Sequence, residues 1–126
     1  MKYFVFLNNI LNKKMNFELK NLPKRSKKNR NVGLTMVMDK GLSYREAEDL
    51  MESGSDFIDI IKLGFGTGLI SKKIKEKIQL YKQNNIKVHL GGTLFEAFIA
   101  RNMFDEYIDF IKKINIDTIE ISDGSI

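Results

Sequence analysis

The stretch VGLTMVMDKGLSYREAEDLMESG, residues 32–54, decides the fold. Its first part, residues 32–38, is a nearly continuous apolar run with β-branched residues, which is typical of a parallel strand covered on both faces. The part that follows has a helical period, and Ser43 and Glu46 at its start are spaced as a capping box. Gly54 is placed to end this helix. The stretch is therefore one β-α unit.

The spacing of apolar residues changes between strand-like and helix-like three more times along the chain. This pattern predicts further strands at about 57–63, 86–90 and 118–121. The spacing of roughly 25 to 30 residues between strands predicts an α/β fold of parallel (β/α) units, the first four of a TIM barrel. Such a half barrel has an open edge at its last strand. A small open four-stranded sheet with helices on both faces is the alternative, but no dinucleotide or phosphate-loop signature follows the first strand.

Charge divides the 126 residues into two parts. Residues 1–30 hold nine Lys and Arg against one acid, a net +8, whereas residues 31–126 hold twelve against fifteen, a net −3. We therefore expect a basic N-terminal extension, residues 1–30, ahead of the half barrel in residues 31–126. Nucleic acid is not the expected partner, because the cationic run from Lys20 to Arg30 contains no aromatic residue for base stacking.

Composition excludes several classes of protein. The chain has no cysteine, so it has no disulfide framework, no thiolate metal site and no cysteine nucleophile. The short apolar stretch near the start lacks the longer core and cleavage site of a secretory signal. No apolar run approaches the ~20 residues that a membrane-spanning helix needs, so we expect a soluble, cytoplasmic protein without a membrane partner.

Polar residues at the carboxyl ends of the predicted strands are the candidates for an active site, because parallel barrels place their chemistry there. Asp39 ends the first predicted strand. A structural role in a turn is the alternative to a role in the active site. Lys62 lies on a buried strand, where an anion or a carboxylate must compensate its charge. Glu120 lies inside the last strand and needs a metal or a lysine, and Lys62 is the expected partner.

The loops after the strands supply further candidates. Gly66 and Thr67 offer backbone N–H and hydroxyl donors suited to an anion, although a tight turn explains the glycines equally well. Glu96 has capping-box spacing with Thr93, so its carboxylate has a structural explanation as well. His89 is a donor to substrate or a hydrogen-bonded core residue, and without a second His or Cys we expect no transition-metal site.

Four segments, in this order, resemble successive strand-to-loop segments of the phosphosulfolactate synthase family. They are LTMVMDKGL at residues 34–42, KLGFGT at 62–67, GGTLFE at 91–96 and EISDG at 120–124. The resemblance runs from about residue 22 to the last residue. It covers the first half of such an enzyme, so the later segments, with a lysine proposed to act in catalysis, have no counterpart.

The resemblance implies a Mg²⁺-dependent carbon-sulfur lyase of coenzyme M or sulfonate biosynthesis. Such an enzyme adds sulfite to phosphoenolpyruvate and forms (2R)-phospho-3-sulfolactate. The implied catalytic residues are Lys62, Glu120 and Asp39, and the implied Mg²⁺ ligands are Asp39, Glu96 and Glu120. The implied substrate-binding residues are Gly66, Thr67, Gly91, Gly92 and Ser122. The proton donor is expected in the half without a counterpart here.

Two other functions remain open on sequence. One is a non-catalytic fragment of a truncated or split barrel, which associates with itself or with a second-half partner. The other is an interaction protein, in which the cationic leader, residues 1–30, binds an acidic partner.

Overall fold

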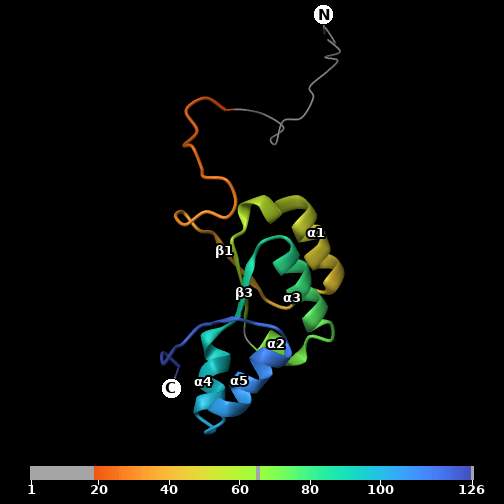
Figure 1. Ribbon diagram of the computed structural model, residues 1–126, viewed down its shortest axis with the longest axis vertical. Coiled ribbons are helices and arrows are strands. Elements are labelled where there is room, and N and C mark those ends of the chain that lie inside the picture. Colours follow the sequence, from red (N-terminus) through yellow and green to blue (C-terminus); the bar gives the residue numbers. More distant parts are fainter. Residues whose placement is uncertain (1–18, 65, 126) are drawn as a thin grey trace, which may run out of the picture.

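The computed structural model describes residues 19–64 and 66–125, so residues 1–18 of the expected N-terminal extension lie outside these ranges. Its elements follow one another as β-α units (Figure 1). The strands are β1 (Met36–Asp39), β2 (Ile60–Leu63), β3 (Lys87–Leu90) and β4 (Thr118–Ile119). The helices are α1 (Tyr44–Gly54), α2 (Thr67–Ile70), α3 (Ile74–Gln83), α4 (Gly92–Ile99) and α5 (Phe104–Lys113), with a 3₁₀ turn, η1 (Ser55–Phe57), ahead of β2.

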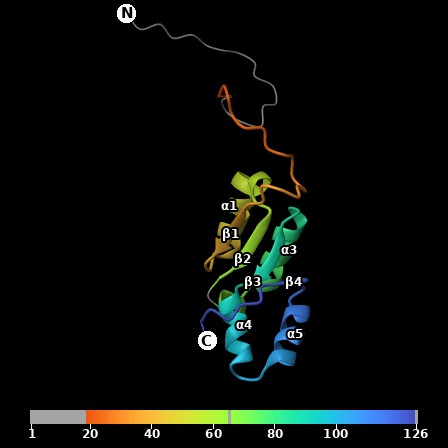
Figure 2. The same ribbon diagram turned by 90° about the vertical axis from the view of Figure 1, so that its left-hand side faces the viewer.

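The four strands form one sheet in the order β1-β2-β3-β4, and every neighbouring pair is parallel. Figure 2 shows the strands side by side, with α1 and α3 packed behind them. The expected α/β fold with parallel strands is confirmed. Within the described ranges no helix has the length and apolar character needed to cross a bilayer.

The strands are shorter than the apolar runs that predicted them. β1 begins at Met36 rather than at residue 32, because its ladder starts where the Thr35 carbonyl accepts the N–H groups of Asp59 and Ile60. Residues 32–34 therefore lie beyond the amino end of β2 and have no ladder partner there. β4 ends at Ile119 because β3 ends at Leu90, its last ladder partner.

The helices form largely where the sequence predicts them. The capping box of Ser43 and Glu46 starts α1 with both reciprocal hydrogen bonds, and α1 ends at Gly54. Asn102, with a φ of 55°, lies in the short break that separates α4 from α5. The short helix α2 was not expected from the sequence.

Alternation along the strands gives the sheet two different faces. The face covered by helices carries Ile61, Leu63, Val88 and Leu90, all of which are almost completely buried in the hydrophobic core. We call the other the open face; its residues are Met36, Met38, Ile60, Lys62, Lys87, His89 and Thr118. Met36 and Met38 are 55% and 39% exposed there, so helices do not cover this side of β1.

The basic residues just before the sheet are bound at the amino ends of the strands. Arg25 and Arg30 both form ion pairs with the buried Asp59, at 3.5 and 3.3 Å. Lys28 donates to the carbonyl oxygens of Ser55 and Asn84. Three of the basic residues in the described part of the N-terminal extension are thus engaged by the domain itself.

Candidate functional site

One row of the sheet places Lys62 at the centre of the open face. Met38 is the register partner of Lys62 on β1, and His89 is its partner on β3. His89 is in turn opposite Thr118 on β4. Since parallel strands end at a common edge, this row lies close to the loops that follow β2, β3 and β4.

Lys62 and Glu120 form the ion pair expected from the sequence. The Lys62 Nζ atom lies 2.8 Å from both carboxylate oxygens of Glu120, and the two side chains are 19% and 33% exposed. His89 Nδ1 lies 3.6 Å from Glu120 and 2.9 Å from the Leu90 carbonyl oxygen. The pair leaves a cation, an anion and an imidazole within reach of a molecule on the open face.

The pKa of Glu120 is set by opposing effects. Burial raises it, but the hydrogen bond and charge of Lys62, the Gly92 backbone N–H and the charge of His89 outweigh burial and lower it below its ordinary value. Glu120 is therefore held as a carboxylate. Its two carboxylate oxygens hold the Lys62 Nζ atom in place.

The glycine pair after β3 allows a close approach that any side chain would obstruct. A Cβ atom at Gly91 would lie 3.3 Å from Lys62 Cε, and one at Gly92 would lie 2.5 Å from Ser122 Cβ and 3.3 Å from Glu120 Oε1. Gly91, Gly92 and Ser122 therefore lie close to the ion pair, and their assignment to substrate binding stays a prediction.

Asp39 lies on the opposite face of the sheet from Lys62. It is 1% exposed, accepts hydrogen bonds from Gly41 N, Leu42 N and Tyr81 Oη, and pairs with Lys77 at 2.6 Å. The structure does not bring Asp39 together with Glu120. The physical reason is the two-residue period of a strand, since Met38 takes the position on the open face beside Lys62.

The Asp39 network was not anticipated from the sequence. Lys77 is on α3 and is 1% exposed, which is unusual for a lysine. Burial raises the pKa of Asp39, but the hydrogen bonds from Lys77, Gly41, Leu42 and Tyr81 together lower it below the ordinary value. A long-range pairing of this kind has no signal in local sequence.

Glu96 has a different role from the capping box considered above. The start of α4 has no side-chain cap, and Glu96 is almost fully buried. Its carboxylate accepts hydrogen bonds from Ser122 Oγ, Gly124 N at 3.1 Å and Ser125 N at 3.0 Å. Glu96 therefore positions the segment after β4, which begins with Glu120.

Gly66 and Thr67 form the entry to α2. Gly66 has a φ of 76°, which favours glycine, so the turn explanation of this loop holds at that residue. Thr67 is buried, its N–H donates to the Gly64 carbonyl, and its Oγ1 atom has no hydrogen-bond partner. Phe65, just before Gly66 in the motif, lies outside the described residues.

The carboxylates proposed as Mg²⁺ ligands are separated in the structure. Asp39 is paired with Lys77 behind the sheet, Glu96 is bound to the loop after β4, and Glu120 is paired with Lys62. Within residues 19–64 and 66–125 no three acidic or histidine side chains come together as a metal site. These three residues do not fit one shared magnesium ion.

Comparison with known proteins gives the family. Residues 23–126 match the family model of (2R)-phospho-3-sulfolactate synthase. The chain is 44% identical to the phosphosulfolactate synthase of Methanocaldococcus jannaschii over 95 residues and 40% identical to that of Methanothermobacter thermautotrophicus over 106. It is 34% identical to the Bacillus subtilis enzyme over 105 residues.

The matches cover most of this chain and a smaller share of each relative. They include 74%, 82% and 83% of the chain, but 38%, 41% and 42% of the three relatives. The chain thus spans about two fifths of the length of these relatives. The resemblance inferred from the four motifs is confirmed: the chain belongs to the (2R)-phospho-3-sulfolactate synthase family.

Proposed function

We propose that this chain supplies part of an active site that adds sulfite to phosphoenolpyruvate. The observation that carries the proposal is the Lys62–Glu120 pair at the carboxyl ends of β2 and β4, beside His89 and the Gly91-Gly92 turn. Family membership supplies the substrates. The partly exposed pair supplies a cation for a substrate that carries both a phosphate and a carboxylate.

The reaction forms one carbon-sulfur bond and breaks no bond to phosphorus. The sulfur lone pair of sulfite attacks the methylene carbon of phosphoenolpyruvate, and the π electrons move to the neighbouring carbon and its carboxylate. A proton then adds to that carbon from one face. In this proposal Lys62 binds the substrate and stabilises the negative charge that develops, whereas Glu120 holds Lys62 in place until the substrate arrives.

Family membership is the only support for Mg²⁺ in this proposal. Of the three carboxylates assigned to it from sequence, Glu120 alone lies beside the open face. Further ligands would come from outside the set of Asp39, Glu96 and Glu120. Bound Mg²⁺ would supply stabilisation of charge on substrate oxygens.

We further propose that the four strands form half of a barrel whose open face becomes its interior. The open face carries the exposed Met36 and Met38 on β1, and Ile121 just after β4 is 74% exposed. The second candidate function, a non-catalytic barrel fragment that pairs with itself or with a second-half partner, is favoured by the same exposed apolar side chains.

Product formation tests the enzymatic proposal. Sulfite and phosphoenolpyruvate are incubated with Mg²⁺ and the chain, alone and mixed with the part of the M. jannaschii relative that the match does not cover. We expect phosphosulfolactate in at least one mixture. If neither incubation gives product and sedimentation shows a mass above that of one chain, the non-catalytic fragment is favoured. If neither gives product and the mass is that of a single chain, both candidate functions are contradicted.

A pair of lysine variants tests the role of Lys62. Lys62→Met is expected to reduce product formation by about 100-fold, because it removes the cation at the substrate. Lys87→Met is the matched control: Lys87 is exposed on the same face but lies at the amino end of β3, opposite Ile60. Equal losses in the two variants would contradict the assignment.

A further inference from the structure

A small cavity lies at the amino ends of the strands, toward the opposite end of the sheet from the Lys62–Glu120 pair. It has a volume of about 270 Å³. Its lining comes from residues 29–31 and 34, from the starts of β2 and β3 with the preceding Asp59, and from Asn85 after α3. The proposed reaction uses none of these residues, so it does not account for this cavity.

Arg30 is the buried cation in the lining, and part of its guanidinium group is unpartnered. Its side chain is 2% exposed. The Nη2 atom donates to the Asp56 carbonyl oxygen at 2.8 Å, and the Nε atom lies 3.3 Å from Asp59 without forming a hydrogen bond. The Nη1 atom has no hydrogen-bond partner among the described residues. Two N–H groups of a buried guanidinium therefore lack an acceptor.

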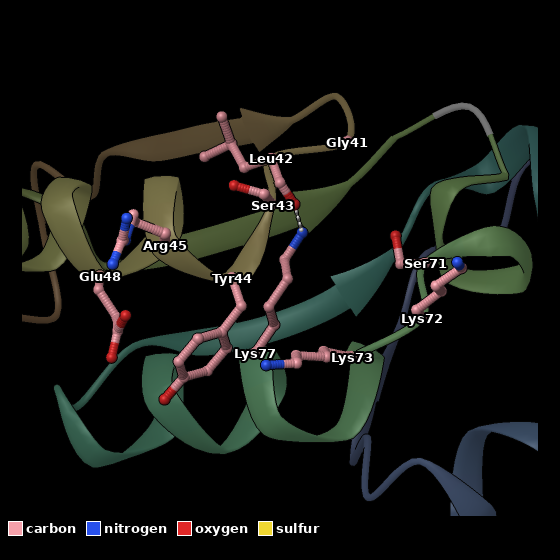
Figure 3. A pocket seen from close by; sticks show the side chains of 10 residues that line it. All are labelled: Gly41, Leu42, Ser43, Tyr44, Arg45, Glu48, Ser71, Lys72, Lys73 and Lys77. Atoms are coloured by element: carbon pink, nitrogen blue, oxygen red, sulfur yellow. Dashed lines mark hydrogen bonds between the residues drawn. The ribbon is translucent and has the colours of Figure 1, made fainter.

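Lys77, whose side chain is also 2% exposed, shows how the fold satisfies a buried cation. Its Nζ atom is 2.6 Å from Asp39 and 2.6 Å from the Leu42 carbonyl oxygen, and Figure 3 shows the second contact. Lys77 therefore has its acceptors within the domain. Arg30 does not, and a buried donor without an acceptor is costly. Its remaining acceptor is thus expected from a molecule that enters the cavity.

Charge favours an anion over water as that acceptor. Asp59 is the acidic residue in the lining, and it is shared by two arginines, because Arg25 lies 3.5 Å from it and Arg30 lies 3.3 Å from it. Its Oδ2 atom also accepts the Thr35 N–H at 2.8 Å. One carboxylate thus faces two guanidinium groups. Water would accept from Nη1 but would leave this excess of positive charge in place, whereas an anion removes it.

The residues around Arg30 favour a carboxylate with a short apolar chain. A phosphate dianion would be repelled by the Asp59 carboxylate about twice as strongly as a singly charged carboxylate at the same distance. Leu34 and Ile60 also line the cavity, and they offer apolar surface to an aliphatic chain.

We propose that this cavity binds a small aliphatic carboxylate. The carboxylate accepts hydrogen bonds from Arg30 Nη1, and the aliphatic chain contacts Leu34 and Ile60. The site is separate from the Lys62–Glu120 pair, so it stands or falls independently of the addition of sulfite to phosphoenolpyruvate.

Butyrate and butyramide test the site, because they have nearly the same shape and differ in charge. NMR spectra of the chain are recorded with each compound at constant ionic strength. With butyrate we expect saturable shifts in the amides of residues 30–34 and 59–60 and in the Arg30 Nε–H signal. Butyramide is expected to bind at least about tenfold more weakly, since it loses the charge-assisted contact.

Three results would overturn the proposal. Equal binding of butyrate and butyramide would show that charge does not select the ligand. No saturable shift with butyrate would show that water alone serves Arg30. Tighter binding of inorganic phosphate than of butyrate at the same residues would show that the cavity does not select a carboxylate.

Two arginine variants provide a matched control, because both arginines pair with Asp59. Arg30→Lys keeps the charge but has no Nη1 atom, and it is expected to raise the butyrate dissociation constant by at least about tenfold. Arg25→Lys changes a side chain that is 41% exposed and lies outside the lining, and it is expected to change the constant by less than about twofold. Equal weakening by both contradicts the site. If Arg30→Lys does not fold, the difference between butyrate and butyramide in the parent chain decides.

Discussion

At the scale of single residues, the side of a strand on which a charge lies decides its role. Asp39 and Lys62 both come near the end of an apolar strand, and both are candidates by that criterion. Asp39 lies toward α3, where Lys77 and Tyr81 compensate its carboxylate. Lys62 lies on the open face with Glu120. The first arrangement stabilises the fold, and the second is accessible from the open face.

Replacing Lys77 is expected to be costly for stability. Lys77→Met leaves the buried Asp39 without its cation and removes the hydrogen bond to Leu42, and we expect the free energy of unfolding to fall by about 3 kcal/mol. Urea denaturation measures the change. Lys82→Met is the control, because its pair with Asp117 is largely exposed, and it should cost less than about 1 kcal/mol. Similar losses in both variants would contradict this account.

Acid is expected to destabilise the protein through the same residues. The pKa values of Asp39 and Glu96 are lowered from 3.8 and 4.5, Glu96 mainly by the hydrogen bond from Ser122. Their contribution is complete above these ordinary values and is lost as the pH falls through the lowered ones. Urea midpoints between about pH 5 and pH 2 should therefore fall. The Lys77→Met variant should show a smaller fall, and an equal one would contradict the role of Asp39.

At the scale of elements, the contact between the start of α4 and the loop after β4 builds the candidate site. Glu96 on α4 holds Ser122, Gly124 and Ser125, and the absence of a side chain at Gly92 lets Ser122 approach. The short β4 has only two ladder partners, so these contacts beyond its end place Glu120 next to Lys62.

Adding one methyl group at the start of α4 tests this contact. In Gly92→Ala the new Cβ would lie 2.5 Å from Ser122 Cβ, and we expect a loss of about 2 kcal/mol in stability as the loop is displaced. Thermal denaturation measures it. Gly124→Ala, where an added Cβ meets no atom within 4 Å, is expected to change stability by less than about 0.5 kcal/mol. A neutral Gly92→Ala variant would show that the loop does not depend on this approach.

At the scale of the whole molecule, the basic segment before the sheet is part of the domain. Arg25 and Arg30 converge on Asp59, which also accepts the Thr35 N–H at 2.8 Å. Lys28 links the segment to η1 and to the turn after α3. The interaction-protein hypothesis needs free cations in this segment, and these three are engaged at the amino ends of the strands.

Releasing this segment should make it accessible to protease. In Asp59→Asn both arginines lose their carboxylate, and we expect trypsin to cleave between residues 24 and 30 several times faster than in the parent chain. Mass spectrometry of timed digests identifies the sites. Asp49→Asn, an exposed position on α1, serves as the control. Unchanged cleavage in Asp59→Asn would mean that other contacts hold the segment.

The sequence by itself determined the order of the β-α units, the parallel sheet, the first helix cap and the family. Hydrophobic period and capping are local properties, and the four motifs could be recognised without coordinates. Tertiary structure alone decided that Asp39 faces Lys77, that Glu96 holds the loop after β4 and that the basic residues are bound to Asp59. Each of these pairings joins residues far apart along the chain, so it depends on how strands and helices pack, which a local pattern does not encode.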